Sequence, residues 1–265
     1  CVLIGESPEN ANTIKRNSLD SMNYQLAIPS QIPSEIITQR PDYMRAELMV
    51  EKAGLDVKIA KKEYSQEEKT KILTSIGVNE NKPIVLVFGG SQGAQKINEA
   101  IIGILENKMN KEYQIVWATG PKQFDIIKEE LASKNIDINN IENAKILPYI
   151  YNMEEIMNIS NVIVARSGAM TITEISNLGK PSILVPLPNV SQNHQLYNAK
   201  VLADVGAAKI ILNDELKKEN LNEEIEKIIK NPELMHKMEE KAISKSVKNV
   251  QDKIYKEIKK VVKAK

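Results

Sequence analysis

The chain has 265 residues, of which 42% are hydrophobic and 27% charged, with a formal net charge of +1. This length suits one large or two modest domains. The near-neutral charge and an aromatic content of only 4% argue against nucleic-acid binding. A single cysteine and two histidines exclude an internal disulfide framework and a cysteine- or histidine-based metal site.

No apolar run approaches the roughly 20 residues that span a bilayer, and no signal peptide is visible, so we expect a cytoplasmic protein. The first residue is Cys1, which indicates a piece of a longer protein. Residues 1–45 give weak signals: short strands are predicted at 2–4 and 24–28, and prolines follow. A helix is predicted at 46–53.

Strand and helix signals alternate from residue 61 onward. Ser65 and Glu68 predict a capping box for a helix that ends at Gly77. The pattern then predicts strands at 84–88, 114–118, 145–147, 162–165, 182–185 and 208–212. Helices are predicted around 97–105 and 124–131 and at 153–159, 169–178, 195–205 and 221–229, with a long Lys/Glu-rich helix after 231–232. This alternation is typical of a doubly wound, Rossmann-like α/β domain with a parallel sheet.

The stretch PIVLVFGGSQGA at 83–94 is the strongest local signal. An unbroken apolar run predicts a strand buried on both faces, and the glycine-rich turn after it leads into a helix. Such a turn directs backbone N–H groups and the positive end of the helix dipole at an anion, most simply a phosphate. Gly93 lets the backbone approach, and Ser91 and Gln92 add hydrogen-bonding side chains. The alternative is a tight connection that binds nothing.

Two further stretches carry polar groups. VARSGAMTITE at 164–174 repeats the strand–turn–helix pattern and ends at Glu174, a candidate acceptor for both hydroxyls of a ribose. The alternative for Glu174 is an acid placed near a helix N-terminus for its dipole. SQNHQLYNA at 191–199 gathers amides and one imidazole, which suit sugar hydroxyls, although an ordinary polar loop would look the same.

GGSQGA at 89–94, RSGAMTITE at 166–174 and NHQLYNA at 193–199 together resemble the donor-binding half of the MurG glycosyltransferases of family 28. The resemblance covers roughly residues 61–215 and implies a GT-B architecture of two Rossmann-like domains. It assigns 1–45 to a remnant of the N-terminal acceptor domain and linker. It assigns 46–240 to the C-terminal UDP-sugar-binding domain and 241–265 to a helix that packs back toward the N-terminal domain.

The resemblance also implies roles for single residues. Ser91, Gln92 and Gly93 would face the UDP diphosphate, and the uracil would lie at Tyr149 and the backbone of Ile150. The segment MRAEL at 44–48 is similar to the family's NPVRAEL, although 43–44 depart from its Pro-Val. On this match, Arg45 would be the hinge arginine that reaches the diphosphate.

The remaining roles fall on two helices. Glu174 would hold the ribose hydroxyls. Three residues would begin the helix beneath the phosphates and sugar: Ala169, Met170 and Thr171. Three more would lie near the GlcNAc hydroxyls: His194, where many members have Gln, and Gln195 and Asn198.

The implied reaction transfers GlcNAc from UDP-GlcNAc to the C4 hydroxyl of a lipid-linked N-acetylmuramoyl-pentapeptide, with inversion, in peptidoglycan synthesis. The implied place of this reaction is the cytoplasmic face of the membrane, contacted through the N-terminal domain, with no metal or other cofactor. The family's GGTGGH segment and its candidate general base are not in this sequence, so the base is expected in an N-terminal domain. Two alternatives stay open: a non-catalytic UDP-sugar-binding module that needs a separate acceptor-domain partner, and a UDP-sugar epimerase of the same fold.

Overall fold

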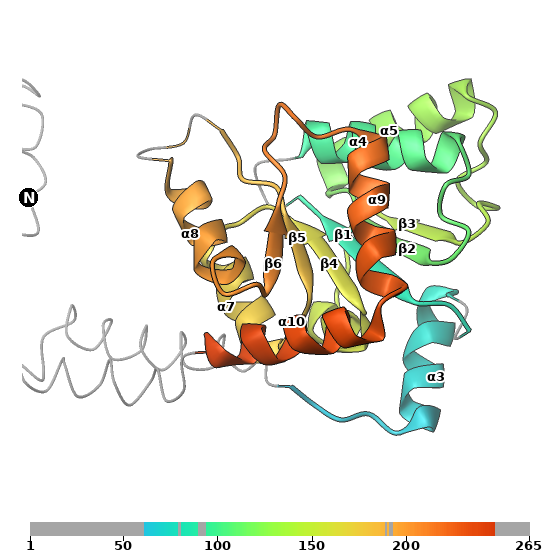
Figure 1. Ribbon diagram of the computed structural model, residues 1–265. Helices are drawn as coiled ribbons and strands as arrows, with labels where there is room; N and C mark the ends of the chain where they lie inside the picture. The colour runs from blue at the N-terminus through green and yellow to red at the C-terminus, as the bar shows by residue number, and fades with distance from the viewer. Residues whose placement is uncertain (1–60, 79–80, 90–93, 189, 191–192, 247–265) are drawn as a thin grey trace, which may run out of the picture. The chain divides into compact units, whose positions relative to one another are not determined.

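The structure of the protein, a computed structural model, describes residues 61–78, 81–89, 94–188, 190 and 193–246 (Figure 1). They belong to one compact unit, Glu51–Lys253. The strands and helix predicted before residue 54, the MRAEL segment with Arg45, and the turn residues Ser91, Gln92 and Gly93 lie outside the described residues.

The described part is a six-stranded parallel sheet with helices on both faces. Its strands are β1 (Ile84–Phe88), β2 (Gln114–Ala118), β3 (Ala144–Leu147), β4 (Val162–Ala165), β5 (Ser182–Leu184) and β6 (Ala208–Ile210). Its helices are α3 (Gln66–Ile76), α4 (Gln95–Glu106), α5 (Pro121–Ser133), α6 (Met153–Ile159), α7 (Ala169–Leu178), α8 (His194–Ala203), α9 (Lys218–Ile229) and α10 (Pro232–Ser244).

The strand order is β3-β2-β1-β4-β5-β6. This is the order of a Rossmann fold, in which the chain winds outward from β1 in one direction and from β4 in the other. The predicted fold class is therefore confirmed for this domain. β3 and β6 are the edge strands, and each carries a lysine at an inner position, Lys145 and Lys209.

The four inner strands, β1, β2, β4 and β5, bury both of their faces, as the unbroken apolar runs predict. In β1, Val85 and Val87 belong to the core beneath α4, α5 and α9, whereas Ile84 and Leu86 belong to the core beneath α3, α6, α7 and α8. Figure 1 shows α4 and α9 on one side of the sheet and α7 and α8 on the other. The sheet is thus a rigid platform whose strand ends place the loops.

Local signals fix most of the element ends. The predicted capping box is present, since the Ser65 side chain accepts from the Glu68 N–H while the Glu68 carboxylate accepts from the Ser65 N–H, and Gly77 ends α3 in the left-handed conformation. The break at 231–232 is also confirmed, because the Asn231 side chain caps α10 by accepting from the Leu234 N–H.

Three predicted ends are too long. Helix α8 stops at Ala203 rather than 205, strand β5 at Leu184 rather than 185 and strand β6 at Ile210 rather than 212. The residues beyond them continue the apolar pattern, but Leu212 is exposed and pairs with no strand. Apolar pattern alone did not locate the last hydrogen-bonded residue.

Candidate functional site

The carboxyl ends of β1 and β4 form the switch point of the sheet. The two strands are paired, with Phe88 opposite Ala165, and they lead away to opposite halves of the sheet. In open α/β sheets, ligands bind in the crevice at this point. The first two predicted motifs begin there, the glycine turn at Gly89 and the RSGA turn at Arg166, so the fold brings them side by side.

The chain turns very tightly where β1 ends. A Cβ atom on Gly89 would lie 2.2 Å from the Cβ of Ala94, so only glycine fits without a shift. Ala94 is the N-cap of α4, and its side chain forms no capping hydrogen bond. Because the first N–H groups of a helix have no partner within the helix, this end of α4 carries hydrogen-bond donors and positive dipole charge near the switch point.

Helix α7 begins in the same way next to it. Its N-cap is Gly168, which provides no side-chain hydrogen bond, and Ala169 and Met170 in the first turn are exposed. A Cβ on Gly168 would meet nothing closer than Thr171 Oγ1 at 4.0 Å, so the space in front of this turn is open. Two uncapped helix N-termini on neighbouring strands make a setting suited to a phosphate group.

Glu174 lies in the second turn of α7 and is half-buried. Burial raises the pKa of its carboxyl group above the ordinary value, and no other cause contributes to this shift. A partly desolvated carboxylate forms strong hydrogen bonds with hydroxyl donors. The structure thus places the predicted ribose acceptor on the helix that starts at the switch point.

The loop after β3 carries the predicted base-binding residues. Ile150 is buried in the core that also contains Ile172 of α7, which ties this loop to that helix. Tyr149 is 57% exposed, and its ring meets the more exposed ring of Tyr151 edge to face, with centroids 5.0 Å apart. An exposed aromatic pair of this kind offers a surface on which a planar base can stack.

The third motif begins helix α8, where His194 is exposed at the first position. Gln195 accepts hydrogen bonds twice: its Oε1 from the Leu187 N–H at 3.0 Å and its backbone oxygen from Ser167 Oγ at 2.7 Å. Asn198 Nδ2 donates to the Ser167 backbone oxygen at 3.0 Å. These two amides join α8 to the turns after β4 and β5, a role that the sequence did not reveal.

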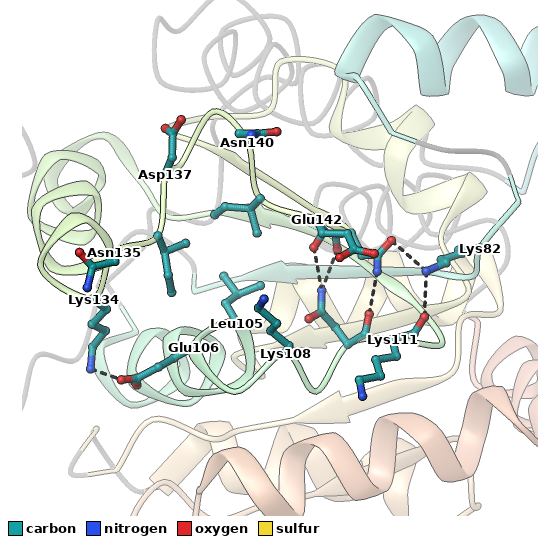
Figure 2. Close-up of a pocket in the computed structure, with 14 residues that line it drawn as sticks. Lys82, Leu105, Glu106, Lys108, Lys111, Lys134, Asn135, Asp137, Asn140 and Glu142 are labelled. Atoms are coloured by element: carbon teal, nitrogen blue, oxygen red, sulfur yellow. Dashed lines mark hydrogen bonds and ion pairs between the residues drawn. The ribbon is translucent and has the colours of Figure 1, made fainter.

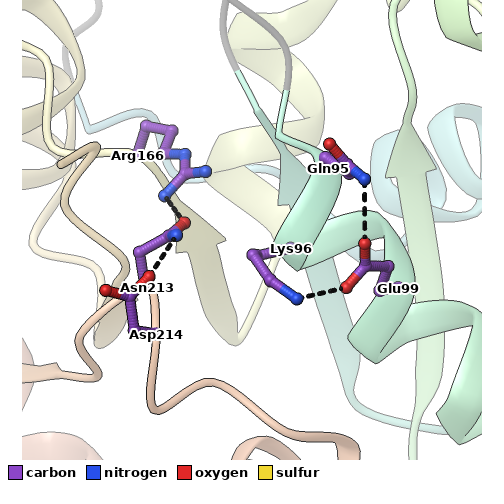
Figure 3. A network of polar contacts seen from close by, with 6 residues as sticks. All are labelled: Gln95, Lys96, Glu99, Arg166, Asn213 and Asp214. Atoms are coloured by element: carbon purple, nitrogen blue, oxygen red, sulfur yellow. Dashed lines mark hydrogen bonds and ion pairs between the residues drawn. The ribbon is translucent and has the colours of Figure 1, made fainter. Parts of the chain in front are cut away.

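The sequence also did not single out Arg166, which directly follows β4. Its side chain is buried, with 7% exposed, and its Nη1 donates to Val185 O at 3.1 Å, Pro186 O at 3.3 Å and Asn213 Oδ1 at 2.9 Å. Figure 3 shows Arg166 meeting Asn213, with Lys96 and Glu99 of α4 across from them. The sequence did contain one signal that could have identified Arg166, namely a charged residue directly after a predicted buried strand.

A second polar cluster lies on the first turn of α4 in the same view. Glu99 accepts from Lys96 Nζ at 2.8 Å and from Gln95 Nε2 at 3.1 Å. The hydrogen bond to Glu99 raises the pKa of Lys96, and Asp214 adds to this effect. The cation next to the glycine turn is therefore held in its charged form.

A hollow of about 690 Å³ lies at the opposite edge of the sheet, as Figure 2 shows. Lys82, which precedes β1, donates there to the Lys111 backbone oxygen at 2.9 Å and to Asn143 Oδ1 at 3.0 Å, and Lys134 pairs with Glu106 at 3.0 Å. These residues precede the strands or follow the helices, so the hollow is at the amino edge and separate from the switch point.

The described ranges contain neither a metal-binding cluster nor a membrane-spanning helix. Among residues 61–246 outside the gaps named above, no three His, Cys, Asp or Glu side chains gather to hold a metal ion. Within the same ranges, no helix has the length and apolar character to cross a bilayer. The absence of a cofactor stays a prediction.

The chain matches a known family model. Residues 84–254, more than half of the chain, match the model described as "Glycosyltransferase family 28 C-terminal domain". Two curated relatives carry the name UDP-N-acetylglucosamine--N-acetylmuramyl-(pentapeptide) pyrophosphoryl-undecaprenol N-acetylglucosamine transferase. The one from Thermoanaerobacter sp. (strain X514) is 38% identical over 71% of this chain and 51% of its own length. The one from Lactobacillus helveticus (strain DPC 4571) is 40% identical over 72% and 50%.

Solved structures agree. The crystal structure of MurG from Acinetobacter baumannii aligns with a TM-score of 0.60 and 29% identity, over 68% of this chain and 53% of that one. A UDP-N-acetylglucosamine 2-epimerase from Listeria monocytogenes, described as putative in its title, aligns with a TM-score of 0.52 and 17% identity over 78% and 50%, which shows a shared fold alone.

The resemblance predicted from three motifs is thus confirmed, and the chain spans about half the length of the curated relatives it matches. The matched region contains β1, the switch point and all three motifs. On this match, the chain belongs to glycosyltransferase family 28, through the C-terminal domain of that family.

Proposed function

We propose that this chain is the donor-binding half of an enzyme that transfers GlcNAc from UDP-GlcNAc to the C4 hydroxyl of a lipid-linked N-acetylmuramoyl-pentapeptide. The observation that carries the proposal is the pair of uncapped helix N-termini at the β1–β4 switch point, with the half-buried carboxylate of Glu174 on one of them. The names of the family relatives support the identity of the sugar and the acceptor.

In this proposal, the diphosphate binds where α4 and α7 begin. The acceptor hydroxyl gives its proton to a general base, expected in the N-terminal domain, and its oxygen forms a bond to the anomeric carbon with inversion. The bond from that carbon to the phosphate oxygen breaks, so UDP leaves with the electron pair. Free N–H groups and helix dipoles stabilise the charge that develops on the leaving diphosphate. They are in place before the reaction and need no reorganisation.

The other roles that the family resemblance implies complete the proposed site. Glu174 accepts hydrogen bonds from the ribose hydroxyls, and the uracil lies against Tyr149 with its edge at the Ile150 backbone. His194, Gln195 and Asn198 lie toward the sugar, and Ser91, Gln92, Gly93 and Arg45 serve the diphosphate. The acceptor is presented at the cytoplasmic face of the membrane, where the enzyme binds peripherally.

The test is a calorimetric titration of the chain with UDP-GlcNAc, with UDP-glucose and ADP-glucose as controls. We expect saturable binding of UDP-GlcNAc, weaker binding of UDP-glucose and no binding of ADP-glucose. Equal binding of the adenine and uracil nucleotides would contradict the base assignment. Absence of binding by all three would contradict a donor site in this chain.

Turnover is a separate test. UDP release from UDP-GlcNAc in the presence of a lipid-linked muramoyl-pentapeptide would support the transferase. Formation of UDP-ManNAc from UDP-GlcNAc without any acceptor would instead indicate an epimerase. Donor binding with neither reaction would favour a binding module that works with a partner.

A further inference from the structure

Arg166 connects three strand ends at the carboxyl edge of the sheet. It directly follows β4, its Nη1 donates to two backbone oxygens after β5, on Val185 and Pro186, and the same nitrogen donates to Asn213 after β6. One buried side chain therefore holds the exits of three neighbouring strands together, and Figure 3 shows its contact with Asn213.

The next residue continues the connection to α8. Ser167 Oγ donates to the Gln195 backbone oxygen, and the Ser167 backbone oxygen accepts from Asn198. Gln195 in turn accepts from the N–H of Leu187, one residue beyond the segment that Arg166 holds. The dipeptide Arg166-Ser167 is thus connected both to residues 185–186 after β5 and to Gln195 and Asn198 of α8.

From this geometry we infer that Arg166 is a positioning residue for the sugar subsite. It acts through the turn at 185–187 and through Gln195 and Asn198, whose amides lie toward the sugar in the proposed function, and it does not itself bind the diphosphate. The inference rests on that proposed function. It states that the buried Arg166 controls which sugar of a UDP-sugar donor the site prefers.

Burying the charge of Arg166 lowers the stability of the fold, so a purely structural role would be unfavourable. All three acceptors of Nη1 are neutral oxygens, and the buried Nε has no hydrogen-bond partner among the described residues. Burying a guanidinium without a carboxylate is unfavourable for stability. Arg166 offsets this cost by joining the segments after β5 and β6 through three hydrogen bonds from one nitrogen. Lysine would carry its donors on a flexible stem, without the fixed planar geometry of the guanidinium.

The experiment measures sugar discrimination separately from nucleotide affinity. Dissociation constants for UDP, UDP-GlcNAc and its C4 epimer UDP-GalNAc are compared in the wild-type chain, Arg166→Lys and Arg166→Gln. We expect both variants to lose about 5- to 10-fold of the preference for UDP-GlcNAc over UDP-GalNAc. Their affinity for UDP itself is expected to stay within about threefold of wild type, because Arg166 itself makes none of the proposed nucleotide contacts.

Two variants of Asn213 test whether Arg166 acts through its hydrogen bonds. Asn213→Ala removes one of the three acceptors of Arg166. It is expected to lower the preference for UDP-GlcNAc over UDP-GalNAc, but by less than the Arg166 variants do. Asn213→Asp keeps an acceptor in place and adds a charge complementary to Arg166, so the preference is expected to remain. Loss of the preference in Asn213→Asp would overturn the inference.

Lys180 supplies a matched control, since it too is a largely buried cation that donates to two backbone oxygens, on Asn158 and Ser160, but at the amino edge of β5. Lys180→Met is expected to lower stability and leave the sugar preference unchanged. If it lowers the preference as Arg166→Gln does, the effect is general destabilisation and the inference is wrong.

The remaining outcomes separate this inference from the proposed function. A parallel loss of UDP and UDP-GlcNAc affinity in Arg166→Gln, restored in Arg166→Lys, would make Arg166 a charge for the phosphates and overturn the positioning role. A wild-type chain that binds UDP without distinguishing the two sugars would overturn it as well. A wild-type chain that binds no UDP compound would overturn the proposed function itself.

Discussion

Glu174 is the residue on which the nucleotide assignment depends most directly. In the proposed donor site, ribose hydroxyls donate to its carboxylate, and a hydrogen bond to a charged group contributes about 1.5–3 kcal/mol. We therefore expect Glu174→Ala to weaken UDP binding by about 10- to 100-fold, measured by calorimetry. Glu223→Ala, an exposed acid on α9, is the matched control and should bind as wild type. Unchanged UDP binding in Glu174→Ala would remove the ribose assignment.

The same carboxyl group predicts a pH dependence. Burial raises the pKa of Glu174, so acidification protonates it earlier than an exposed acid. Only the ionised form offers both oxygens to the ribose, so UDP affinity should fall as the pH drops through that raised pKa. Titrating wild type and Glu174→Gln in parallel cancels the titration of the ligand's own phosphate. Identical pH profiles would contradict a role for the carboxylate.

Lys180 gives a prediction about stability. Burial lowers its pKa to about 8, while its ammonium group donates to the Asn158 and Ser160 backbone oxygens at the end of α6. Between this folded value and the ordinary unfolded value near 10.4, the unfolded chain binds more protons. Stability should therefore rise with pH in that interval, and the rise is lost in a variant without the amine.

Urea unfolding at pH 7.5 and pH 9.5 measures this effect. We expect the stability gap between wild type and Lys180→Met to widen by about 1 kcal/mol at the higher pH. Comparing the two proteins at each pH removes the contribution of the other groups. A gap that narrows with rising pH would show that Lys180 is not desolvated in the folded protein.

At the scale of elements, the turns after β1 and β4 look alike in sequence but respond differently to an added methyl group. On Gly89 it would clash with Ala94, whereas on Gly168 it would project into open space at the start of α7. We expect Gly89→Ala to cost about 1–3 kcal/mol of folding stability. Gly168→Ala should change stability by less and weaken UDP binding, because the methyl group occupies the diphosphate position. Thermal unfolding and calorimetry of both variants separate the two effects.

Sequence alone predicted the bounds of an element well where an apolar run and flanking turn residues coincide. Strands β1, β2 and β4 have the predicted bounds because each is a continuous apolar run between turn residues. The strand order was not predictable in detail, because periodicity describes which face of an element is buried and not which strand lies next to it. Three motifs at strand ends nevertheless indicated that the site lies at the carboxyl edge.

The contacts within the site were less accessible to sequence reasoning. Gln195 and Asn198 were predicted as sugar ligands from their chemistry, and the structure shows that they also join α8 to the turns after β4 and β5. The roles of Arg166 and Asn213 depend on residues 47 positions apart. Such a pairing arises from the strand order, so no local pattern in the sequence contains it.

At the scale of the whole domain, both faces of the sheet are covered, so only its two edges could continue the hydrogen-bonded ladder. The edge strands β3 and β6 are short, with four and three residues, and Lys209 in the middle of β6 is exposed. Short, lysine-bearing edges hinder pairing with the edge of another molecule, because a second sheet would have to bury the charge. This domain is therefore protected against open-ended growth by its outermost strands. Replacing Lys209 with valine should make the domain self-associate as concentration rises, an outcome that light scattering would register.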